Sequence, residues 1–330
     1  MPGTNCDRIE KLKIGRVLGQ GTFGITYAVT DPDTDKVYAL KILDFGKIVS
    51  ETQRQEEMET SLQEIYILSK LHNAAENGCI PFNICLLDWC QTGSTIQVLM
   101  PILKGMNLMD WRMFWPKNLA LKALREKVPH LNRKVTLLLL HIMACMAAAV
   151  SELHSRDIIH RDIKLNNMVI DSLPLNPTTI NNIKVTLGLV DFGMACNVSG
   201  VYACESTPKG TLQYMSREVL KSYAKPIPPE QFAAADIYAL GVSFHILITG
   251  KQFIHGNKME IIGKIMSDNI TIGDDMMSNR MVDLLEMMLH EDPLQRPPIG
   301  MVQILLSRII DELNDAKDTE EEDELLFHMF

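Results

Sequence analysis

The sequence is poor in basic residues. Its 330 residues include 32 Lys and Arg against 41 Asp and Glu, and the formal net charge at neutral pH is -9. Such a chain lacks the excess of cations with which nucleic-acid-binding proteins displace counterions from a phosphate backbone. We therefore predict no nucleic-acid partner and regard basic peptides as more compatible partners.

Long hydrophobic runs are also missing. The longest apolar stretch, residues 135–150, contains His141 and falls short of the roughly 20 residues that a bilayer-spanning helix needs. The first residues lack the succession of charged, apolar and small residues that forms a secretory signal. We predict a buried core helix over residues 135–150 and no association with a membrane.

Paired cysteine motifs are a third absence. The seven cysteines show no CxxC spacing, and no histidine pair completes a zinc site beside Cys79, Cys85 and Cys90, which come closest to a cluster. We interpret all seven as reduced thiols, which predicts an intracellular protein of the cytoplasm or the nucleus.

The first hundred residues carry the patterns of strands and one helix. Strand-like patterns cover residues 14–29 (two strands around a glycine turn), 36–43, 84–89 and 95–100, the last of which ends at Pro101. Residues 51–71 have helical spacing, with an inward face made of Leu62, Ile65, Ile67, Leu68 and Leu71. These patterns predict a small β-sheet with one helix packed on it.

The rest of the chain has a mainly helical texture. Helical patterns cover residues 109–125, 135–154, 233–249 and 281–290, and two strand-like pieces lie at 167–171 and 183–190. Acidic residues from Asp311 onward predict a solvated tail. The expected fold class is α+β, with a small β-rich lobe followed by a larger helical lobe.

Gly19, Gly21 and Gly24 form a GxGxxG motif between two predicted strands. The absence of side chains allows backbone N–H groups to approach a triphosphate closely. A dinucleotide-binding motif would continue into a helix, whereas residues 25–29 continue as a strand. A tight hairpin without a ligand is the remaining alternative for this motif taken alone.

Lys41 follows on the next predicted strand, within an otherwise apolar ribbon. A buried ammonium group needs a partner, and both ATP phosphates and a helix carboxylate are suitable. Glu64 is the preferred carboxylate because it lies among the inward-facing residues of the predicted helix. Glu56, Glu57 and Glu59 are its competitors.

Residues 160–167 match the pattern HRDxKxxN and are the most informative segment. Asp162 has the spacing of a base that accepts a hydroxyl proton, Lys164 that of a cation for the transferred phosphoryl group, and Asn167 that of a magnesium ligand. Asp191, at the start of Asp-Phe-Gly, supplies a carboxylate for the same metal.

Taken in this order, these motifs resemble the eukaryotic protein kinase superfamily from about Ile14 to Ile310. The resemblance implies a two-lobed kinase fold. It divides the chain into an N-terminal extension (1–13), a kinase domain (14–310) and an acidic tail (311–330). Within the domain it places the N-lobe at 14–100, the hinge at 101–108 and the C-lobe at 109–310.

The resemblance also implies roles for single residues. Gly19, Gly21 and Gly24 would cover the ATP phosphates, and Lys41 would bind the α and β phosphates and pair with Glu64. Asp162 and Lys164 would be catalytic, and Asn167 and Asp191 would bind Mg²⁺. Met100 would be the gatekeeper, and the backbone from Pro101 to Leu103 would meet the adenine. The implied activity is transfer of the γ-phosphate of ATP to proteins.

Lys164 and Thr211 resemble the residues of serine/threonine kinases, so Ser and Thr hydroxyls are the expected acceptors. Glu218 would form a structural pair with Arg296, and Thr207 is our hypothesis for a regulatory phosphorylation site. Two alternatives stay open, a pseudokinase that acts as a binding scaffold and a small-molecule kinase of the same architecture.

Overall fold

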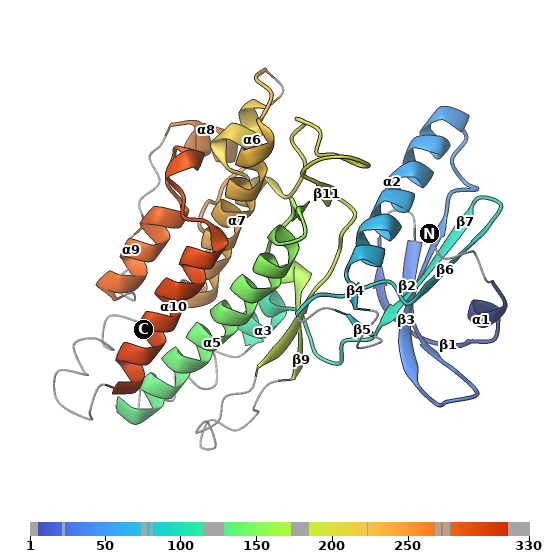
Figure 1. Ribbon diagram of the computed structural model, residues 1–330, viewed down its shortest axis with the longest axis horizontal. Coiled ribbons are helices and arrows are strands. Elements are labelled where there is room, and N and C mark those ends of the chain that lie inside the picture. The colour runs from blue at the N-terminus through green and yellow to red at the C-terminus, as the bar shows by residue number, and fades with distance from the viewer. Residues whose placement is uncertain are drawn as a thin grey trace. The chain divides into compact units, whose positions relative to one another are not determined.

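The computed structural model describes residues 6–21, 24–73, 78–79, 82–114, 129–172, 185–222, 224–267, 272 and 278–315. The chain divides into two compact units. Unit 1 comprises Met1–Lys104 and Val190–Ala195, and unit 2 comprises Gly105–Leu189 and Cys196–Phe330. Figure 1 labels the elements of both units, which are described one at a time below.

Unit 1 is built on a five-stranded antiparallel sheet in the order β1-β2-β3-β7-β6. The strands are β1 (Lys13–Gln20), β2 (Gly24–Thr30), β3 (Val37–Asp44), β6 (Asp88–Thr92) and β7 (Thr95–Pro101). The predicted strand over residues 84–89 is wrong at its start. Ile84, Cys85 and Leu86 are buried in a connection that precedes β6, so their apolar character reflects burial without strand pairing.

Helix α2 (Glu51–Lys70) packs beside this sheet (Figure 1). Ser50 begins it as an N-cap, because its side chain accepts a hydrogen bond from the backbone N–H of Gln53. Ile65, Ile67 and Leu68 of the predicted inward face are buried, and so is Glu64, whereas Leu62 is only partly buried. Leu71 is also buried and lies at the C-cap of the helix. After the helix, β4 (His72–Asn73) pairs with β5 (Gly78–Cys79).

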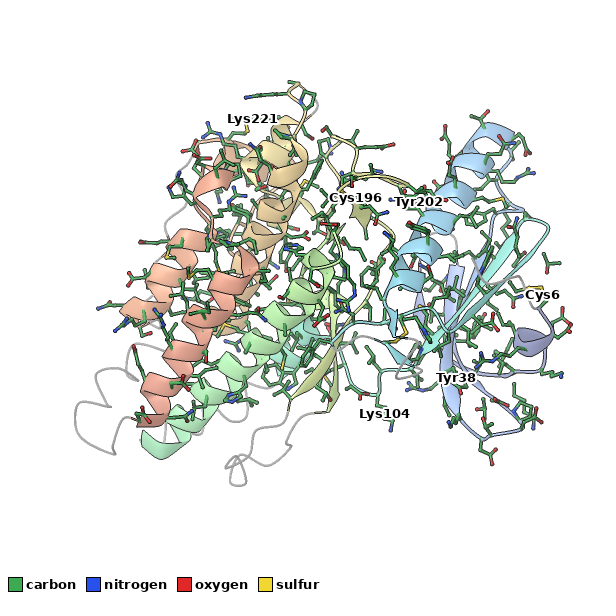
Figure 2. The ribbon with its side chains drawn as sticks, in the orientation of Figure 1. Cys6, Tyr38, Lys104, Cys196, Tyr202 and Lys221 are labelled. Carbon is green, nitrogen blue, oxygen red and sulfur yellow. A yellow bond between two sulfur atoms is a disulfide. The ribbon has the colours of Figure 1, made fainter. Side chains whose placement is uncertain are left out.

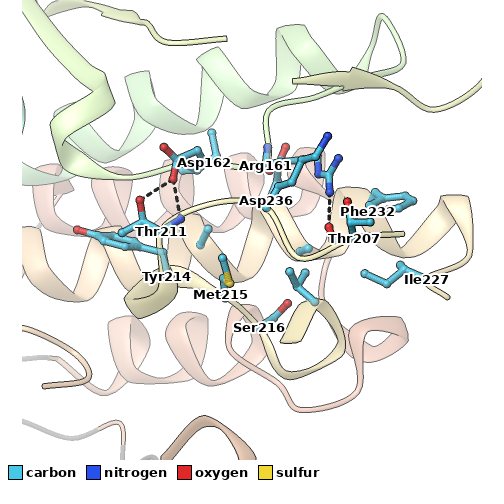
Figure 3. A pocket seen from close by; sticks show the side chains of 15 residues that line it. Arg161, Asp162, Thr207, Thr211, Tyr214, Met215, Ser216, Ile227, Phe232 and Asp236 are labelled. Carbon is cyan, nitrogen blue, oxygen red and sulfur yellow. Dashed lines mark hydrogen bonds between the residues drawn. The ribbon is translucent and has the colours of Figure 1, made fainter. Parts of the chain in front are cut away.

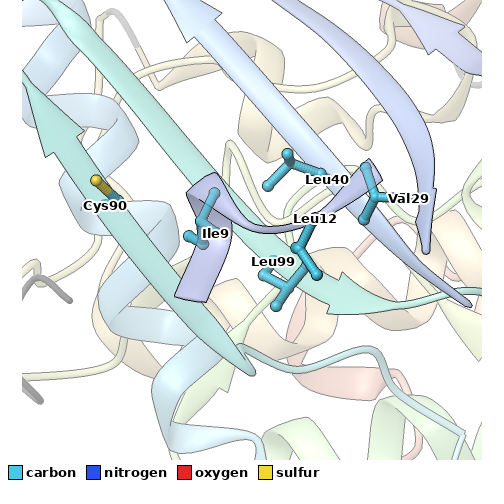
Figure 4. Close-up of a cluster of buried hydrophobic side chains, with 6 residues drawn as sticks. All are labelled: Ile9, Leu12, Val29, Leu40, Cys90 and Leu99. Atoms are coloured by element: carbon cyan, nitrogen blue, oxygen red, sulfur yellow. The ribbon is translucent and has the colours of Figure 1, made fainter. Parts of the chain in front are cut away.

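A short N-terminal helix, α1 (Cys6–Glu10), was not predicted from the sequence. It carries Ile9 onto the sheet, and Leu12 follows just after it (Figure 4). The two side chains join a buried cluster whose other members are Val29, Leu40, Cys90 and Leu99. Part of the expected N-terminal extension therefore belongs to the hydrophobic core of unit 1.

The prediction that all seven cysteines are reduced is wrong. Disulfides join Cys6 to Cys90, Cys79 to Cys85 and Cys196 to Cys204, and Cys145 is free. Figure 2 labels Cys6 and Cys196, one cysteine from each of two pairs. Pairing depends on distance in the folded chain, and the sequence separation of 84 residues between Cys6 and Cys90 hides their proximity.

Unit 2 is mainly helical. Its helices are α3 (Leu108–Phe114), α5 (Pro129–His154), α6 (Arg217–Lys221), α7 (Pro229–Thr249), α8 (Lys258–Met266), α9 (Asn279–Met288) and α10 (Ile299–Asp315). Two small antiparallel ladders join β8 (Ile158–Ile159) to β11 (Cys196–Asn197) and β9 (Met168–Ser172) to β10 (Thr186–Leu189). Single 3-10 turns are η1 (Leu165–Asn167), η3 (Leu212–Tyr214) and η4 (Pro293–Gln295).

The predicted α+β fold class is confirmed, and three predicted segments differ from the structure or extend beyond the described residues. The expected helix over residues 109–125 is found up to Phe114, and its remaining residues lie outside the described part of the chain. Residues 183–184 of a predicted strand also lie outside it. The predicted solvated tail begins later than expected, because α10 continues to Asp315. Residues 311–315 of this helix are mostly exposed, and residues 316–330 are not described.

Two helices of unit 2 are long and apolar enough to cross a membrane by length and composition alone. The Val135–His154 window is 61% buried inside the protein, and the Gln231–Thr249 window is 83% buried. Within α5, Leu138, Ile142 and Val150 are almost completely buried. Apolar helices that form the core of a domain have this character, as predicted for residues 135–150.

Candidate active site

The Lys41 side chain lies on β3, where residue 41 pairs with Thr26 of β2 and Val98 of β7. Its Nζ donates to both carboxylate oxygens of Glu64, at 2.8 and 2.7 Å. Glu64 is only 7% exposed, whereas Glu56 and Glu59 are exposed. The predicted pairing of Lys41 with Glu64 is confirmed, and the pair satisfies two charges that would otherwise be costly to bury.

The glycine motif forms the turn between β1 and β2. The backbone N–H of Gly21 donates to the carbonyl of Gly24 at 2.8 Å. A Cβ at Gly24 would lie 2.3 Å from the Ile42 carbonyl oxygen, so β3 leaves room only for glycine there. A Cβ at Gly19 would meet nothing within 4 Å. The open backbone at Gly19 fits the close approach of a phosphate. Thr22 and Phe23 lie outside the described residues.

Residues 190–195, which include Asp191-Phe192-Gly193, belong to unit 1, although the chain on both sides belongs to unit 2. Asp191 has a left-handed backbone with φ 67° and an exposed side chain, while Phe192 is 1% exposed. Gln63 of α2 donates from Nε2 to the Ala195 carbonyl oxygen at 2.6 Å. No motif in the sequence singled out Gln63.

Unit 2 surrounds the Asp162 carboxylate with donors. Its Oδ1 accepts from the Thr211 hydroxyl at 2.7 Å and from the Thr211 backbone N–H at 2.9 Å (Figure 3). Its Oδ2 accepts from Lys164 Nζ at 2.6 Å and from Asn167 Nδ2 at 3.2 Å. Lys164 also donates to the Thr211 hydroxyl at 2.9 Å. A carboxylate held in this way is placed to accept a proton from a hydroxyl group.

Asn167 is oriented through its amide nitrogen, which also donates to the Asp162 backbone carbonyl at 2.9 Å. The predicted contact of Asn167 with Mg²⁺ would be made by its side-chain oxygen. Among the described residues, no group of three or more His, Cys, Asp and Glu side chains is arranged to hold a metal ion. Mg²⁺ binding by Asn167 and Asp191 stays a prediction, and Mg²⁺ is commonly bound by one or two protein oxygens together with the phosphates of a substrate.

Asp236 of α7 stabilises the backbone at His160 and Arg161, next to Asp162. Its carboxylate accepts from the backbone N–H groups of His160 and Arg161, both at 2.9 Å, and from His154 Nε2 at 3.1 Å. Burial alone would raise the pKa of Asp236, but the hydrogen bonds and positive charges of His154 and His160 lower that pKa overall. The hydrogen bonds of Asp236 support Arg161, whose φ of 66° is in the left-handed region.

Arg161 joins this segment to residues that follow the Cys196–Cys204 disulfide. Its guanidinium donates to the Thr207 carbonyl at 2.5 Å and lies over the Phe232 ring at 5.6 Å (Figure 3). Burial lowers the pKa of Arg161, and the charges of Asp236 and Glu205 oppose that shift. The Thr207 hydroxyl is buried, and it has no hydrogen-bond partner among the described residues.

Tyr214 lines the same hollow as Asp162, Thr211 and Met215 (Figure 3). Burial, with a smaller contribution from the Asp162 charge, raises the pKa of Tyr214 to about 12. The phenol is therefore neutral at physiological pH. Its oxygen is buried and has no hydrogen-bond partner in the part of the chain that the structure describes.

The predicted pair of Glu218 and Arg296 is confirmed. Arg296 donates from both terminal nitrogens to the two Glu218 oxygens, at 2.7 and 3.0 Å. The preceding residues, Ser216 and Arg217, form side-chain contacts of their own. The Ser216 hydroxyl donates to Glu218 at 2.6 Å, and Arg217 forms an ion pair with Glu291.

The residues expected to meet adenine lie at the end of unit 1. Met100 is 8% exposed and pairs with Ala39 in the ladder between β3 and β7, and Pro101 pairs with Tyr38. Leu103 follows β7, one residue before unit 1 ends at Lys104. Their backbone role is a prediction that these contacts leave untested.

Known proteins resemble this chain over most of its length. A serine/threonine-protein kinase of Arabidopsis thaliana, AtPK2/AtPK19, is 29% identical over 288 residues, which are 87% of this chain and 51% of that protein. Ribosomal protein S6 kinase alpha-2 of Mus musculus is 26% identical over 310 residues, which are 92% of this chain and 36% of that protein. The chain thus spans about half or less of the length of these relatives.

The family model of the protein kinase domain matches residues 12–307. The match includes the glycine turn, the Lys41–Glu64 pair, the Asp162 segment and the Glu218–Arg296 pair described above. The chain belongs to the protein kinase domain family.

Proposed function

We propose that this protein is an active serine/threonine protein kinase, which transfers the γ-phosphate of ATP, in the presence of Mg²⁺, to Ser and Thr hydroxyls of protein substrates. The observation that carries the proposal is the Asp162 carboxylate, which holds the Thr211 hydroxyl at 2.7 Å with Lys164 beside it. A substrate hydroxyl in the place of that hydroxyl would have a base for its proton and a cation for the incoming phosphoryl group.

The other residues take complementary roles in this proposal. Gly19, Gly21 and Gly24 cover the phosphates of ATP, and Lys41, oriented by Glu64, neutralises part of their charge. Asn167 and Asp191 hold Mg²⁺, which supplies charge neutralisation of the transferred group when bound. Met100 and the backbone of Pro101 to Leu103 meet the adenine.

Serine and threonine are the proposed acceptors for two reasons. AtPK2/AtPK19 of Arabidopsis thaliana, which resembles the chain, is named as a serine/threonine-protein kinase. In addition, Lys164 and Thr211, the two residues that suggested this class, are hydrogen-bonded to each other at 2.9 Å. The intracellular location stays an untested prediction, and the three disulfides remove the reduced thiols from which it was inferred.

A pseudokinase is the alternative from a different functional class. The bonded geometry around Asp162 and the intact Lys41–Glu64 pair favour an active enzyme over it. A small-molecule kinase is disfavoured because the segment from Gly210 to Glu218, expected to bind a peptide, is held in place at Thr211 and Glu218.

The test is phosphate transfer from labelled ATP to a generic basic protein by wild type and Asp162→Asn. Loss of a general base costs about 10²–10⁴-fold in rate, so we expect Asp162→Asn to be at least about 10²-fold slower while it still binds ATP. Asp157→Asn is the matched control, because Asp157 is exposed and asparagine tolerates its φ of 56°. An inactive wild type, or equal rates in the two variants, would refute the proposal.

A further inference from the structure

The turn that carries Asp191 depends on contacts with unit 1. Residues 190–195 group with unit 1, although Leu189 and Cys196 on either side group with unit 2. The turn is closed internally by the Ala195 backbone N–H, which donates to the Phe192 carbonyl at 3.0 Å. That bond sets the shape of the turn but does not attach it to any other element.

Gln63 supplies an attachment. Its Nε2 donates to the Ala195 carbonyl at 2.6 Å, which links α2 to a residue 132 positions later in the chain. The next residue of α2 is Glu64, which holds Lys41. Two adjacent residues of α2 therefore contact Lys41 on one side and the end of the Asp191 turn on the other.

The surroundings of Gly193, inside the turn, show how close the Asp191 and Glu64 carboxylates are to the turn. Consider a Cβ atom added at Gly193. It would lie 3.6 Å from Asp191 Oδ1 and 3.8 Å from Glu64 Oε2. The Asp191 carboxylate and the Glu64 carboxylate thus approach the same small volume. Because Glu64 is paired with Lys41, the turn holds the Asp191 carboxylate close to the Lys41–Glu64 pair.

We infer that Gln63 is a positioning residue, which holds the Asp191 turn in register with the Lys41–Glu64 pair. The side chain has the chemistry for this task, because a neutral amide donates to a carbonyl without adding charge beside two carboxylates. The consequence for nucleotide binding rests on the proposed function, in which Asp191 holds Mg²⁺.

The test compares Gln63→Met with wild type. Methionine keeps the length and packing of the side chain but cannot donate a hydrogen bond. Loss of one hydrogen bond shifts an opening equilibrium by about fivefold. We expect amide hydrogen exchange in a peptide spanning residues 192–195 to become about fivefold faster in the full chain without nucleotide.

The second readout is the Mg²⁺ concentration that gives half of the thermal stabilisation by a non-hydrolysable ATP analogue. We expect this concentration to rise about fivefold in Gln63→Met, in line with the same opening equilibrium. Gln55→Met is the matched control, because Gln55 is exposed on the same helix and bonds only to Glu51 at 3.4 Å. It should leave both measurements unchanged.

Each failure has its own signature. Unchanged exchange in Gln63→Met, or equal effects in Gln55→Met, would overturn the inference. Faster exchange without a change in Mg²⁺ dependence would overturn its consequence for nucleotide binding. The first measurement needs neither nucleotide nor transfer, and the second needs no transfer. An inactive wild type with the expected exchange result would therefore refute the proposed kinase activity and leave the role of Gln63 as an anchor of the turn intact.

Discussion

Arg296 is a buried charged residue of unit 2 whose guanidinium is bonded to protein groups in place of water. Its side chain is 1% exposed, and it donates to the Glu218 carboxylate and to the carbonyls of His290 and Ala234. It also lies 5.0 Å from the centre of the Tyr238 ring. Each nitrogen of the guanidinium therefore has an acceptor that replaces its hydration, and the Tyr238 ring adds a cation–π contact.

Replacing Arg296 with alanine should destabilise the protein strongly. Removal of one member of a buried ion pair leaves the other charge uncompensated, at a cost of about 3–5 kcal/mol. Urea unfolding of Arg296→Ala would measure the loss. In Arg280→Ala, which removes an exposed pair with Glu312, the change should stay within about 1 kcal/mol. Similar losses in both variants would contradict the account of Arg296.

Thr207 shows a limit of reasoning from sequence position alone. Its place before Gly210-Thr211 suggested a phosphorylation site, which remains a prediction. The structure adds that its hydroxyl is buried and that Arg161, a natural phosphate ligand, already binds the Thr207 carbonyl. Phosphorylation of Thr207 would therefore require this part of the segment to open first.

At the scale of elements, helix α1 is the feature that unit 1 adds to the predicted sheet. Ile9 and Leu12 bury themselves on the sheet, Arg8 lies 3.8 Å from Asp88, and Cys6 is joined to Cys90 of β6. The helix has only five residues, and helices this short are not stable alone in water. Tertiary contacts and the disulfide must hold it.

Cys6→Ser should lower the stability of the oxidised protein. A disulfide that closes a loop of 84 residues contributes about 4.5 kcal/mol by the chain-entropy argument. Thermal unfolding with and without a dithiol reductant would measure this contribution. The reductant should lower Tm less in Cys6→Ser than in wild type, because one of the three disulfides is already absent.

Cys145→Ala is the control for this experiment. Cys145 is free and half-buried, so its replacement should alter Tm little and leave the response to reductant as in wild type. Titration of thiols in the denatured oxidised wild-type protein should find one. Seven reactive thiols before any reductant is added would contradict the disulfide pattern.

At the scale of the whole molecule, the net charge of -9 bears on the choice of substrate. A negatively charged protein attracts basic peptides from a distance. Salt screens this attraction beyond the Debye length, which is about 10 Å at 0.1 M. If the proposed activity holds, kcat/KM for an Arg-rich peptide should fall several-fold between about 0.02 and 0.5 M salt.

A neutral peptide with the same phosphoacceptor is the matched control, and its kcat/KM should vary little with salt. Initial rates at low peptide concentration measure both. An equal fall for the two peptides would place the salt effect on the enzyme itself and would rule out long-range attraction of the basic peptide.

The sequence by itself determined the fold class and two side-chain pairs, Lys41 with Glu64 and Glu218 with Arg296. Strand alternation, helical spacing and short motifs are local patterns, so they located most strands and helices and identified Lys41, Glu64, Asp162, Asn167 and Asp191. Where burial and strand pairing produce the same apolar run, as at residues 84–87, the local pattern was misleading.

Only the tertiary structure decided which distant residues meet outside the recognised motifs. The Cys6–Cys90 disulfide joins residues 84 positions apart, and the Gln63–Ala195 hydrogen bond joins residues 132 positions apart. Likewise, the Asp191 turn groups with unit 1 although its neighbours in the chain do not. Such contacts arise from packing of whole elements against each other, and a single glutamine or cysteine has no local periodicity that reports its partner.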